Sequence, residues 1–320
     1  MKHNKKIVCV VFFLVSLIAV SLFSIFRPAK KNYSDIKYFC TCADSFFFPR
    51  LLNLIGTIHK VHFDDLGEIA VFNLGFTAEQ IDKLNSIQKV KVYDLEMTHP
   101  DLLKHVHVGN ADGSPGQGRM VRGWYAWKPV VIKQGLDLFP YMLYLDAGCL
   151  VMNRLDDLFK HIQKNGYFLV GCGHNIRWMT TKSIIEKFDL LSEKRKWILD
   201  DRTSGISAGF QGLTRDVYDA YVNPVYTMSK DLRNFMDDGT CPNGFGTSRH
   251  DQPLFSIQAS LLGMHVNRID PLQKNPIVLH TDTGPSNFWM TWDPKYSNDK
   301  THILLQASYF RKFMSFIRYK

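Results

Sequence analysis

Strand-like and helix-like stretches alternate at short intervals along the first half of the chain, and this order limits the folds open to it. Five short apolar runs predict strands: Tyr38–Cys42, Ile69–Asn73, Val90–Tyr93, Tyr141–Leu145 and Tyr167–Gly171. Four stretches with helical periodicity lie between them: Phe47–Lys60, Thr77–Asn85, Trp127–Leu138 and Leu155–Lys164. Because strands joined through helices pair in parallel, we expect an α/β, Rossmann-type fold with a mainly parallel sheet and helices on both faces.

The second half of the chain is less regular. Residues 182–200 and Gln252–Leu262 predict helices, and Ser207–Leu213 and His265–Ile269 predict strands. The tail, 303–319, mixes apolar and basic residues as an amphipathic helix does. Such a helix can lie on a membrane surface, but we favour its packing against the domain.

The N-terminal region contains one long apolar segment, residues 7–26. Seventeen of its twenty residues are apolar and none is charged. A helix of this length spans about 30 Å, the thickness of the bilayer hydrocarbon. We expect an uncleaved signal anchor rather than a cleaved signal peptide. Residues 1–6 would be a cytoplasmic tail, 27–37 a stem and 38–320 the folded domain of a type II membrane protein. In a eukaryotic cell, that domain would face the lumen of the Golgi or endoplasmic reticulum.

The net charge of +9 does not indicate a nucleic-acid partner. Residues 1–31 hold six lysines and arginines and residues 300–320 hold five, with no acidic residue in either stretch. The intervening part, 32–299, has a net charge of −2. A nucleic-acid binder needs a basic surface on its folded body, so we expect no such partner.

The run YMLYLDAGCLVMN (141–153) is the most informative for chemistry. A predicted buried strand leads directly into Asp146, which is followed by Ala147 and Gly148. Ligands of open parallel sheets bind beyond the carboxyl ends of the strands. An acid there, beside small residues, leaves room for Mg²⁺ or Mn²⁺ and a phosphate. The alternative is that Asp146 only caps a turn after a core strand.

Three further runs carry candidate site residues. CTCAD (40–44) places Ala43 and Asp44 at the end of the first strand, where a nucleotide base commonly docks. SAGFQG (207–212) is either a turn that lets a ligand approach the backbone or an ordinary glycine-rich turn. VLHTDTG (278–284) supplies His280, a residue type that often binds metals but is more often structural.

Taken in this order, these runs resemble the nucleotide-sugar glycosyltransferases of the GT-A fold, most nearly glycosyltransferase family 8 and its relatives. The resemblance spans roughly residues 38–290. Asp44 matches the acid that contacts uracil, and Tyr144-Leu145-Asp146 matches the start of the Y-L-D-x-D hallmark. The remaining matches are the acceptor-facing and sugar-facing turn Ser207-Ala208-Gly209, the pair Asp251-Gln252, and the metal-binding His280 with Gly284.

The chain departs from the family pattern at two places. Gly148 stands where the hallmark has its second Asp, and the late Lys-Pro-Trp is absent. The resemblance therefore implies Mn²⁺ or Mg²⁺ on Asp146 and His280, bound more weakly than usual. A cation from RMVRGWYAWKP (119–129) could replace the missing diphosphate lysine, and the candidates are Arg119, Arg122 and Lys128. Trp124, Tyr125 and Trp127 are either core residues or an aromatic platform for a sugar.

The resemblance implies transfer of a hexose from a nucleoside-diphosphate sugar, with UDP favoured, to a glycan, protein or lipid. Asp251 and Gln252 would lie near the sugar. They would stabilise the cationic transition state if transfer retains configuration, whereas Asp251 would deprotonate the acceptor if transfer inverts it. The main alternative is a catalytically silent relative that binds a glycan or nucleotide. A metal-dependent hydrolase is disfavoured because the 12 histidines are scattered and no H-E-x-x-H occurs. A peptide-binding scaffold would not explain the order of the motifs.

Five cysteines lie beyond the apolar segment: Cys40, Cys42, Cys149, Cys172 and Cys241. Cys40 and Cys42 alternate on a predicted strand and therefore point to one face. We expect them to be buried, reduced and packed as small apolar side chains.

Overall fold

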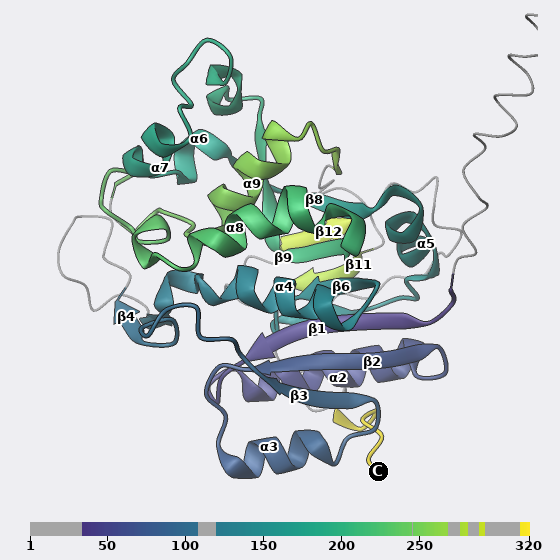
Figure 1. The fold of residues 1–320 in the computed structure, drawn as a ribbon. Helices are drawn as coiled ribbons and strands as arrows, with labels where there is room; N and C mark the ends of the chain where they lie inside the picture. The colour runs from purple at the N-terminus through teal and green to yellow at the C-terminus, as the bar shows by residue number, and fades with distance from the viewer. Residues whose placement is uncertain (1–33, 108–119, 245, 268–275, 281–287, 292–313) are drawn as a thin grey trace, which may run out of the picture. The chain divides into compact units, whose positions relative to one another are not determined.

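The computed structural model describes residues 34–107, 120–244, 246–267 and 314–320, and the backbone of 276–280 and 288–291 (Figure 1). Contacts divide the chain into Met1–Ser34 and Asp35–Lys320, and only the second unit is described below. The expected anchor, 7–26, and Arg119 lie outside the described residues. In the described part, no helix has the length and apolar character needed to span a membrane.

A seven-stranded sheet forms the centre of the unit, in the order β10-β8-β9-β6-β1-β2-β3. Four neighbouring pairs are parallel, and only β9 runs antiparallel to both of its neighbours. The prediction of a mainly parallel sheet is therefore confirmed. The strands are β1 (Lys37–Ala43), β2 (Leu66–Asn73), β3 (Val90–Asp94), β6 (Tyr141–Leu145), β8 (Tyr167–Asn175), β9 (Ser204–Thr214) and β10 (Val266–Asn267).

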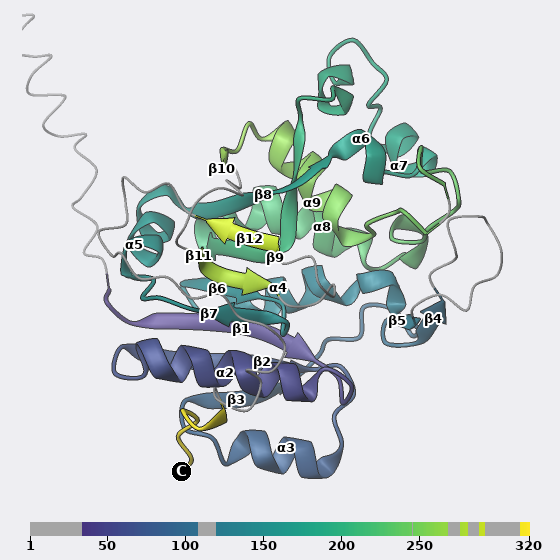
Figure 2. The same cartoon turned by 180° about the vertical axis from the view of Figure 1, so that it is seen from behind.

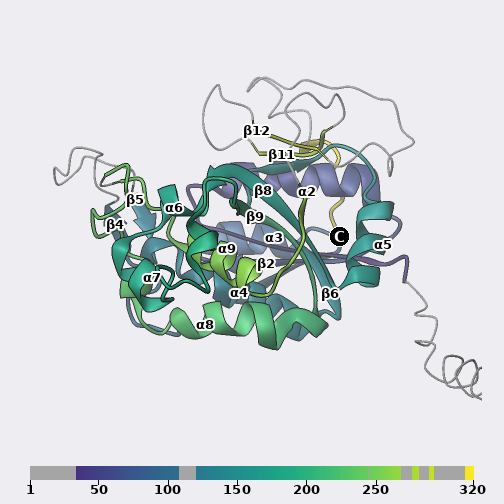
Figure 3. The same ribbon diagram turned by 90° about the horizontal axis from the view of Figure 1, so that it is seen from above.

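Helices cover both faces of this sheet, as Figures 2 and 3 show. One face carries α2 (Phe48–His62), α3 (Ala78–Asn85) and α5 (Asp156–Asn165). The same side carries a small sheet of β7 (Cys149–Val151), β11 (Pro276–His280) and β12 (Phe288–Thr291). The other face carries α4 (Trp127–Leu138), α6 (Ile176–Met179), α7 (Lys182–Lys187), α8 (Asn223–Met228) and α9 (Asp251–Leu261).

Most predicted elements lie at or near the expected residues, and α4 and β6 have the expected bounds. Thr77 caps α3 through the capping box expected with Gln80. The helix predicted over 182–200 is wrong. It ends at Lys187, because Asp189 adopts a left-handed backbone with φ of 51°, and only a short 3₁₀ turn, Lys196–Leu199, follows.

Two buried clusters lie on the two sides of the sheet, and successive side chains of a strand point alternately into one cluster and the other. On β1, Cys40 and Cys42 face the cluster that includes α4, whereas Phe39 faces α2. Both cysteines are buried thiols, as predicted.

The end of the chain packs against the body. Ile317 is buried in the α2 side of the core. The Arg318 amide donates to His59 Nδ1 at 3.1 Å, and the Lys320 amide donates to the Ser86 carbonyl at 2.7 Å. The packing favoured for the tail is thus confirmed for residues 314–320, while 303–313 lie outside the described part.

Candidate active site

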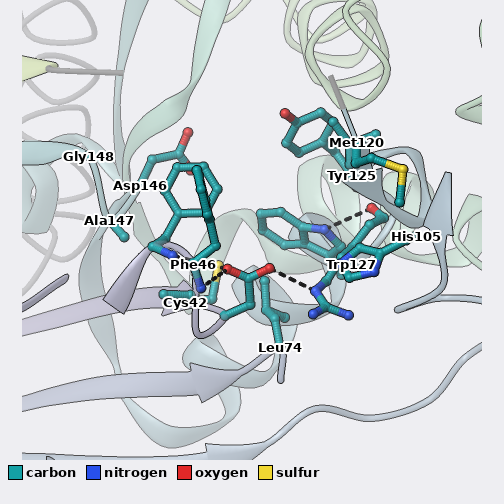
Figure 4. A pocket seen from close by; sticks show the side chains of 15 residues that line it. Cys42, Phe46, Leu74, His105, Met120, Tyr125, Trp127, Asp146, Ala147 and Gly148 are labelled. Carbon is teal, nitrogen blue, oxygen red and sulfur yellow. Dashed lines mark hydrogen bonds and ion pairs between the residues drawn. The ribbon is translucent and has the colours of Figure 1, made fainter. Parts of the chain in front are cut away.

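The carboxyl ends of β1 and β6 bring the two predicted acids to one edge of the sheet. The strands are parallel neighbours, so Asp44 and Asp146, which follow them, both line one cavity of about 460 Å³. Ala43 lines it as well. Figure 4 shows the labelled walls: Asp146, Ala147 and Gly148 on one side, and His105, Met120, Tyr125 and Trp127 on the other.

Asp44 is held by donors on both of its oxygens. Its Oδ1 accepts the amides of Phe46 and Phe47, each at 3.1 Å, at the turn before α2. Its Oδ2 accepts Arg122 Nε at 2.9 Å. Arg122 also donates to the Leu103 carbonyl at 3.0 Å, so a carboxylate and a guanidinium are fixed side by side in the cavity wall.

Asp146 is oriented by side chains from its own strand and from α4. The Tyr144 hydroxyl donates to Asp146 Oδ1 at 2.7 Å. Lys128 Nζ lies 3.2 Å from each carboxylate oxygen. About a quarter of the Asp146 side chain, 26%, is exposed. The carboxylate is therefore fixed in direction but still accessible from the cavity.

Lys128 joins this acid to a second one. Its ammonium also lies 3.3 Å from Asp251 Oδ2, and both side chains of this pair are 6% exposed. Burial raises the pKa of Asp251 to about 6, although Lys128 acts to lower it. Burial by itself would lower the pKa of Lys128, but Asp146 and Asp251 outweigh it and raise that pKa. Lys128, one of the three candidate cations for the diphosphate, is thus the shared partner of two carboxylates.

The predicted Ser207-Ala208-Gly209 turn is part of β9 and lies against Asp146. The Asp146 amide donates to the Gly209 carbonyl at 2.9 Å. A Cβ added at Gly209 would lie 2.3 Å from Asp146 Oδ2. Only glycine leaves the carboxylate in this position. Ala208 is buried, and Ser207 is half-buried on the same strand.

The segment before α4 has a strained backbone. Gly123, Trp124 and Tyr125 have φ of 46°, 53° and 62°, and a Cβ at Gly123 would lie 1.9 Å from the Leu102 carbonyl oxygen. Trp127 follows, lines the cavity and donates Nε1 to the Arg122 carbonyl at 3.1 Å. Strain of this kind persists where the surroundings enforce it, often at functional sites.

His250 is a site residue that the sequence did not indicate. It is buried with φ of 55°, and its ring lies 5.4 Å from that of Trp124 and 5.5 Å from that of Tyr125. Its Nδ1 lies 2.9 Å from the Phe235 carbonyl oxygen. Since His250 directly precedes Asp251, this packing sets where α9 begins. A histidine in a loop carries no local signal of such a role.

The Gln252 side chain forms a hydrogen bond with the Cys172 thiol on β8. Burial raises the pKa of Cys172 although this hydrogen bond acts to lower it. Asp251 and Gln252 are therefore adjacent in sequence but contact different elements.

The divalent metal expected from the sequence can be tested on the described residues. Gly148 provides no side-chain ligand, so Asp146 is the carboxylate that the turn offers. In the small sheet, the backbone of His280 pairs with that of Cys149, next to Gly148. The strand register thus brings residue 280 beside the Asp146 turn, which fits a site with one carboxylate and one histidine. Side-chain positions in β11 lie outside the described part.

A second group of metal-type ligands lies elsewhere. His62, Asp65 and Asp156 offer ligand atoms within 4.8 Å of one another, and they are the one such trio among the described side chains. Lys37 Nζ lies 2.8 Å from both carboxylates, and Arg154 pairs with both as well. Two cations already neutralise the two acids, so we interpret this group as a structural ion-pair network.

Comparison with protein-family models finds no match, and no curated protein sequence is significantly similar to the chain. Solved structures do match. Core-mannan synthase A from Aspergillus fumigatus, in an Mn/GDP form, is 12% identical with a TM-score of 0.49, over 73% of this chain and 71% of that one.

Two further matches are of the same kind. LgtC, as an active-site mutant, is 13% identical with a TM-score of 0.47, over 88% and 96% of the two chains. The mannosyltransferase Ktr4p from S. cerevisiae is 13% identical with a TM-score of 0.47, over 72% and 67%. LgtC is a galactosyltransferase and Ktr4p a mannosyltransferase.

Proposed function

We propose that the chain is a glycosyltransferase that moves a hexose from a nucleoside-diphosphate sugar to an acceptor hydroxyl. One observation carries the proposal: the Lys128 ammonium joins Asp146, at the cavity of the sheet edge, to the buried Asp251. This places a carboxylate with a pKa of about 6 next to a cavity suited to a nucleotide. A group with such a pKa can hold or accept a proton near neutral pH.

Ala43, Asp44 and Arg122 would bind the base. Asp44 accepts and Arg122 donates, so together they suit the imide edge of uracil, and we propose a UDP-hexose as donor. Ser207, Ala208, Gly209 and Trp127 would border the sugar and the acceptor. The acceptor would be a glycan, a protein or a lipid.

Asp146 and His280 would hold Mn²⁺ or Mg²⁺ together with the donor diphosphate. When bound, the ion would act as a Lewis acid that stabilises the leaving diphosphate. With a single carboxylate, affinity should be weaker than at a two-Asp site. Support comes from the exposed part of Asp146 and the register of β11 with β7. Lys128 would hold the Asp146 carboxylate in the position from which it binds the ion.

In the transfer step, the bond between the sugar C1 and the diphosphate oxygen breaks, and a bond from C1 to the acceptor oxygen forms. If configuration inverts, Asp251 accepts the proton of the acceptor hydroxyl. If configuration is retained, Asp251 and Gln252 stabilise the positive charge that develops on the sugar, and the proton passes to the leaving phosphate. Lys128 keeps Asp251 ionised more readily than burial alone would allow.

We further propose that residues 7–26 anchor the enzyme as a type II membrane protein, in the Golgi or endoplasmic reticulum of a eukaryotic cell. The second candidate function is a catalytically silent glycan- or nucleotide-binding relative. The observation that favours it is Gly148, which removes one metal carboxylate.

A donor panel tests the proposal. Thermal unfolding of the full chain is followed with UDP- and GDP-linked hexoses, each with and without Mn²⁺, and release of free sugar is measured in parallel. We expect one donor to raise the melting temperature, more so with Mn²⁺, and to be hydrolysed slowly. A shift without sugar release would favour the silent relative. No shift with any nucleotide would refute the transferase and would leave only a silent relative that binds a glycan.

A further inference from the structure

A group of exposed basic and aromatic side chains lies where β8 ends and α9 begins. It comprises His174, Arg177, Trp178 and Arg249, and we refer to it as the basic rim. The Arg249 amide donates to the Met179 carbonyl at 3.3 Å, which ties the segment before α9 to the last residue of α6. Figure 1 shows α6 beside α9, and the two helices are in contact.

The cations of the rim have no acidic partner among the described residues. Two exposed arginines elsewhere form ion pairs, Arg202 with Asp200 and Arg233 with Asp231. For Arg249 and Arg177, by contrast, no carboxylate of the described part lies within ion-pair distance. As far as the described residues are concerned, the two guanidinium groups are therefore open to an external anion.

An aromatic surface accompanies these charges. Trp178 is 38% exposed, and the Arg177 guanidinium lies 5.3 Å from the centre of its ring. His174 lies near Arg249. Burial and, after it, the charge of this arginine lower the pKa of His174. Exposed indole faces pack against sugar rings, and arginines pair with carboxylates and phosphates.

The rim is connected to the transfer site by β9. Gly209 of this strand packs on Asp146, while Gly205 packs on Cys172 and Met179 beside the rim. Four residues of extended strand span about 13 Å. Arg249 also lies two residues before Asp251. The rim is thus about 13 Å along β9 from the contact with Asp146, on a different element from the base-binding Asp44.

We propose that the basic rim binds an acidic acceptor, a saccharide that carries a carboxylate or phosphate a few sugar units from its accepting hydroxyl. Arg249 and Arg177 pair with the anion, and Trp178 packs on the adjoining sugar. This assignment of acceptor class rests on the proposed glycosyltransferase function. Because Arg249 is exposed and lies outside the donor cavity, it determines acceptor specificity rather than donor binding.

The test uses the full chain on an array of immobilised oligosaccharides in matched sets of three: neutral, uronic-acid-bearing and phosphorylated. We expect half-maximal binding to one acidic arm at a protein concentration at least tenfold lower than to its neutral counterpart, and the arm identifies the anion. Arg249→Gln should remove this preference and Arg249→Lys should retain much of it. Arg202→Gln, at an exposed arginine paired with Asp200, is the matched control and should keep the wild-type preference.

Equal binding of neutral and acidic members, or no binding of acidic ones, would overturn the proposal. So would an equal loss in Arg249→Gln and Arg202→Gln. The nucleotide-dependent thermal shift is measured on the same preparations. A lost shift with a retained acidic preference would refute the transferase function while leaving the anion site, so the two failures are distinguishable.

Discussion

Lys128 and Asp251 form a buried ion pair, with Nζ 3.3 Å from Oδ2, between the first turns of α4 and α9. The same ammonium binds Asp146, so one cation serves two acids. Removing one partner of a buried ion pair leaves an uncompensated charge. This costs far more than replacing both partners with apolar side chains. Lys128 should therefore be the most sensitive side chain of the site.

Replacing Lys128 by Met should destabilise the fold by about 3–5 kcal/mol, because Asp146 and Asp251 would face each other without a cation. Transfer should fall by at least about 100-fold, equivalent to about 2.7 kcal/mol in the barrier. Chemical denaturation and a transfer assay measure the two effects. The double variant Lys128→Met/Asp251→Asn should recover part of the stability but not the activity. If the stability lost in the double variant equals the sum of the losses in the two single variants, Lys128 and Asp251 are not coupled.

Gly209→Ala tests the contact between β9 and the metal-side acid. The new methyl group would lie 2.3 Å from Asp146 Oδ2 and must displace the carboxylate. We expect a loss of about 1–3 kcal/mol in stability and a much larger relative loss of transfer. Gly171→Ala is the matched control, since its Cβ would lie 3.2 Å from the Ser204 hydroxyl, away from Asp146. Similar transfer rates in the two variants would contradict this role.

Asp251 should make stability depend on pH. Its pKa is raised to about 6, first by burial, and the titratable groups that act on it are Lys128, Asp146, Cys42 and Tyr221. In the unfolded chain the carboxyl ionises near its ordinary pKa. The contribution of Asp251 to the free energy of unfolding is therefore complete below about pH 4, and it is lost as the pH rises to about 6. Melting temperatures between pH 4 and 7 should fall more in the wild type than in Asp251→Asn. Parallel curves would refute the raised pKa.

Arg122→Gln tests the base-binding pair. It removes the 2.9 Å contact with Asp44, whose side chain is only 13% exposed, and leaves that acid without its cation. We expect the Kd for the donor nucleotide to rise about tenfold, or about 1.4 kcal/mol, with a loss of about 1–3 kcal/mol in stability. Calorimetric titration with UDP measures the affinity. An unchanged Kd would remove Arg122 from the binding site.

Part of the site could be predicted from the sequence because the signals are local. Apolar runs and helical periodicity predicted β1, β6 and α4. The placement of Asp44 and Asp146 at one sheet edge followed, because parallel strands end on the same side. The prediction of a helix over 182–200 is wrong because the hydrophobic pattern of the sequence does not mark the turn at Asp189.

What the sequence determined by itself is the α/β class and the set of acids at the strand ends, since both depend on residue spacing along a single element. Tertiary structure decided which groups meet: Lys128 between Asp146 and Asp251, Gly209 against a carboxylate, and Arg249 beside α6, where no described carboxylate pairs with it. These relationships join segments far apart in the chain. They arise from packing across the sheet and between helices, which no local pattern encodes.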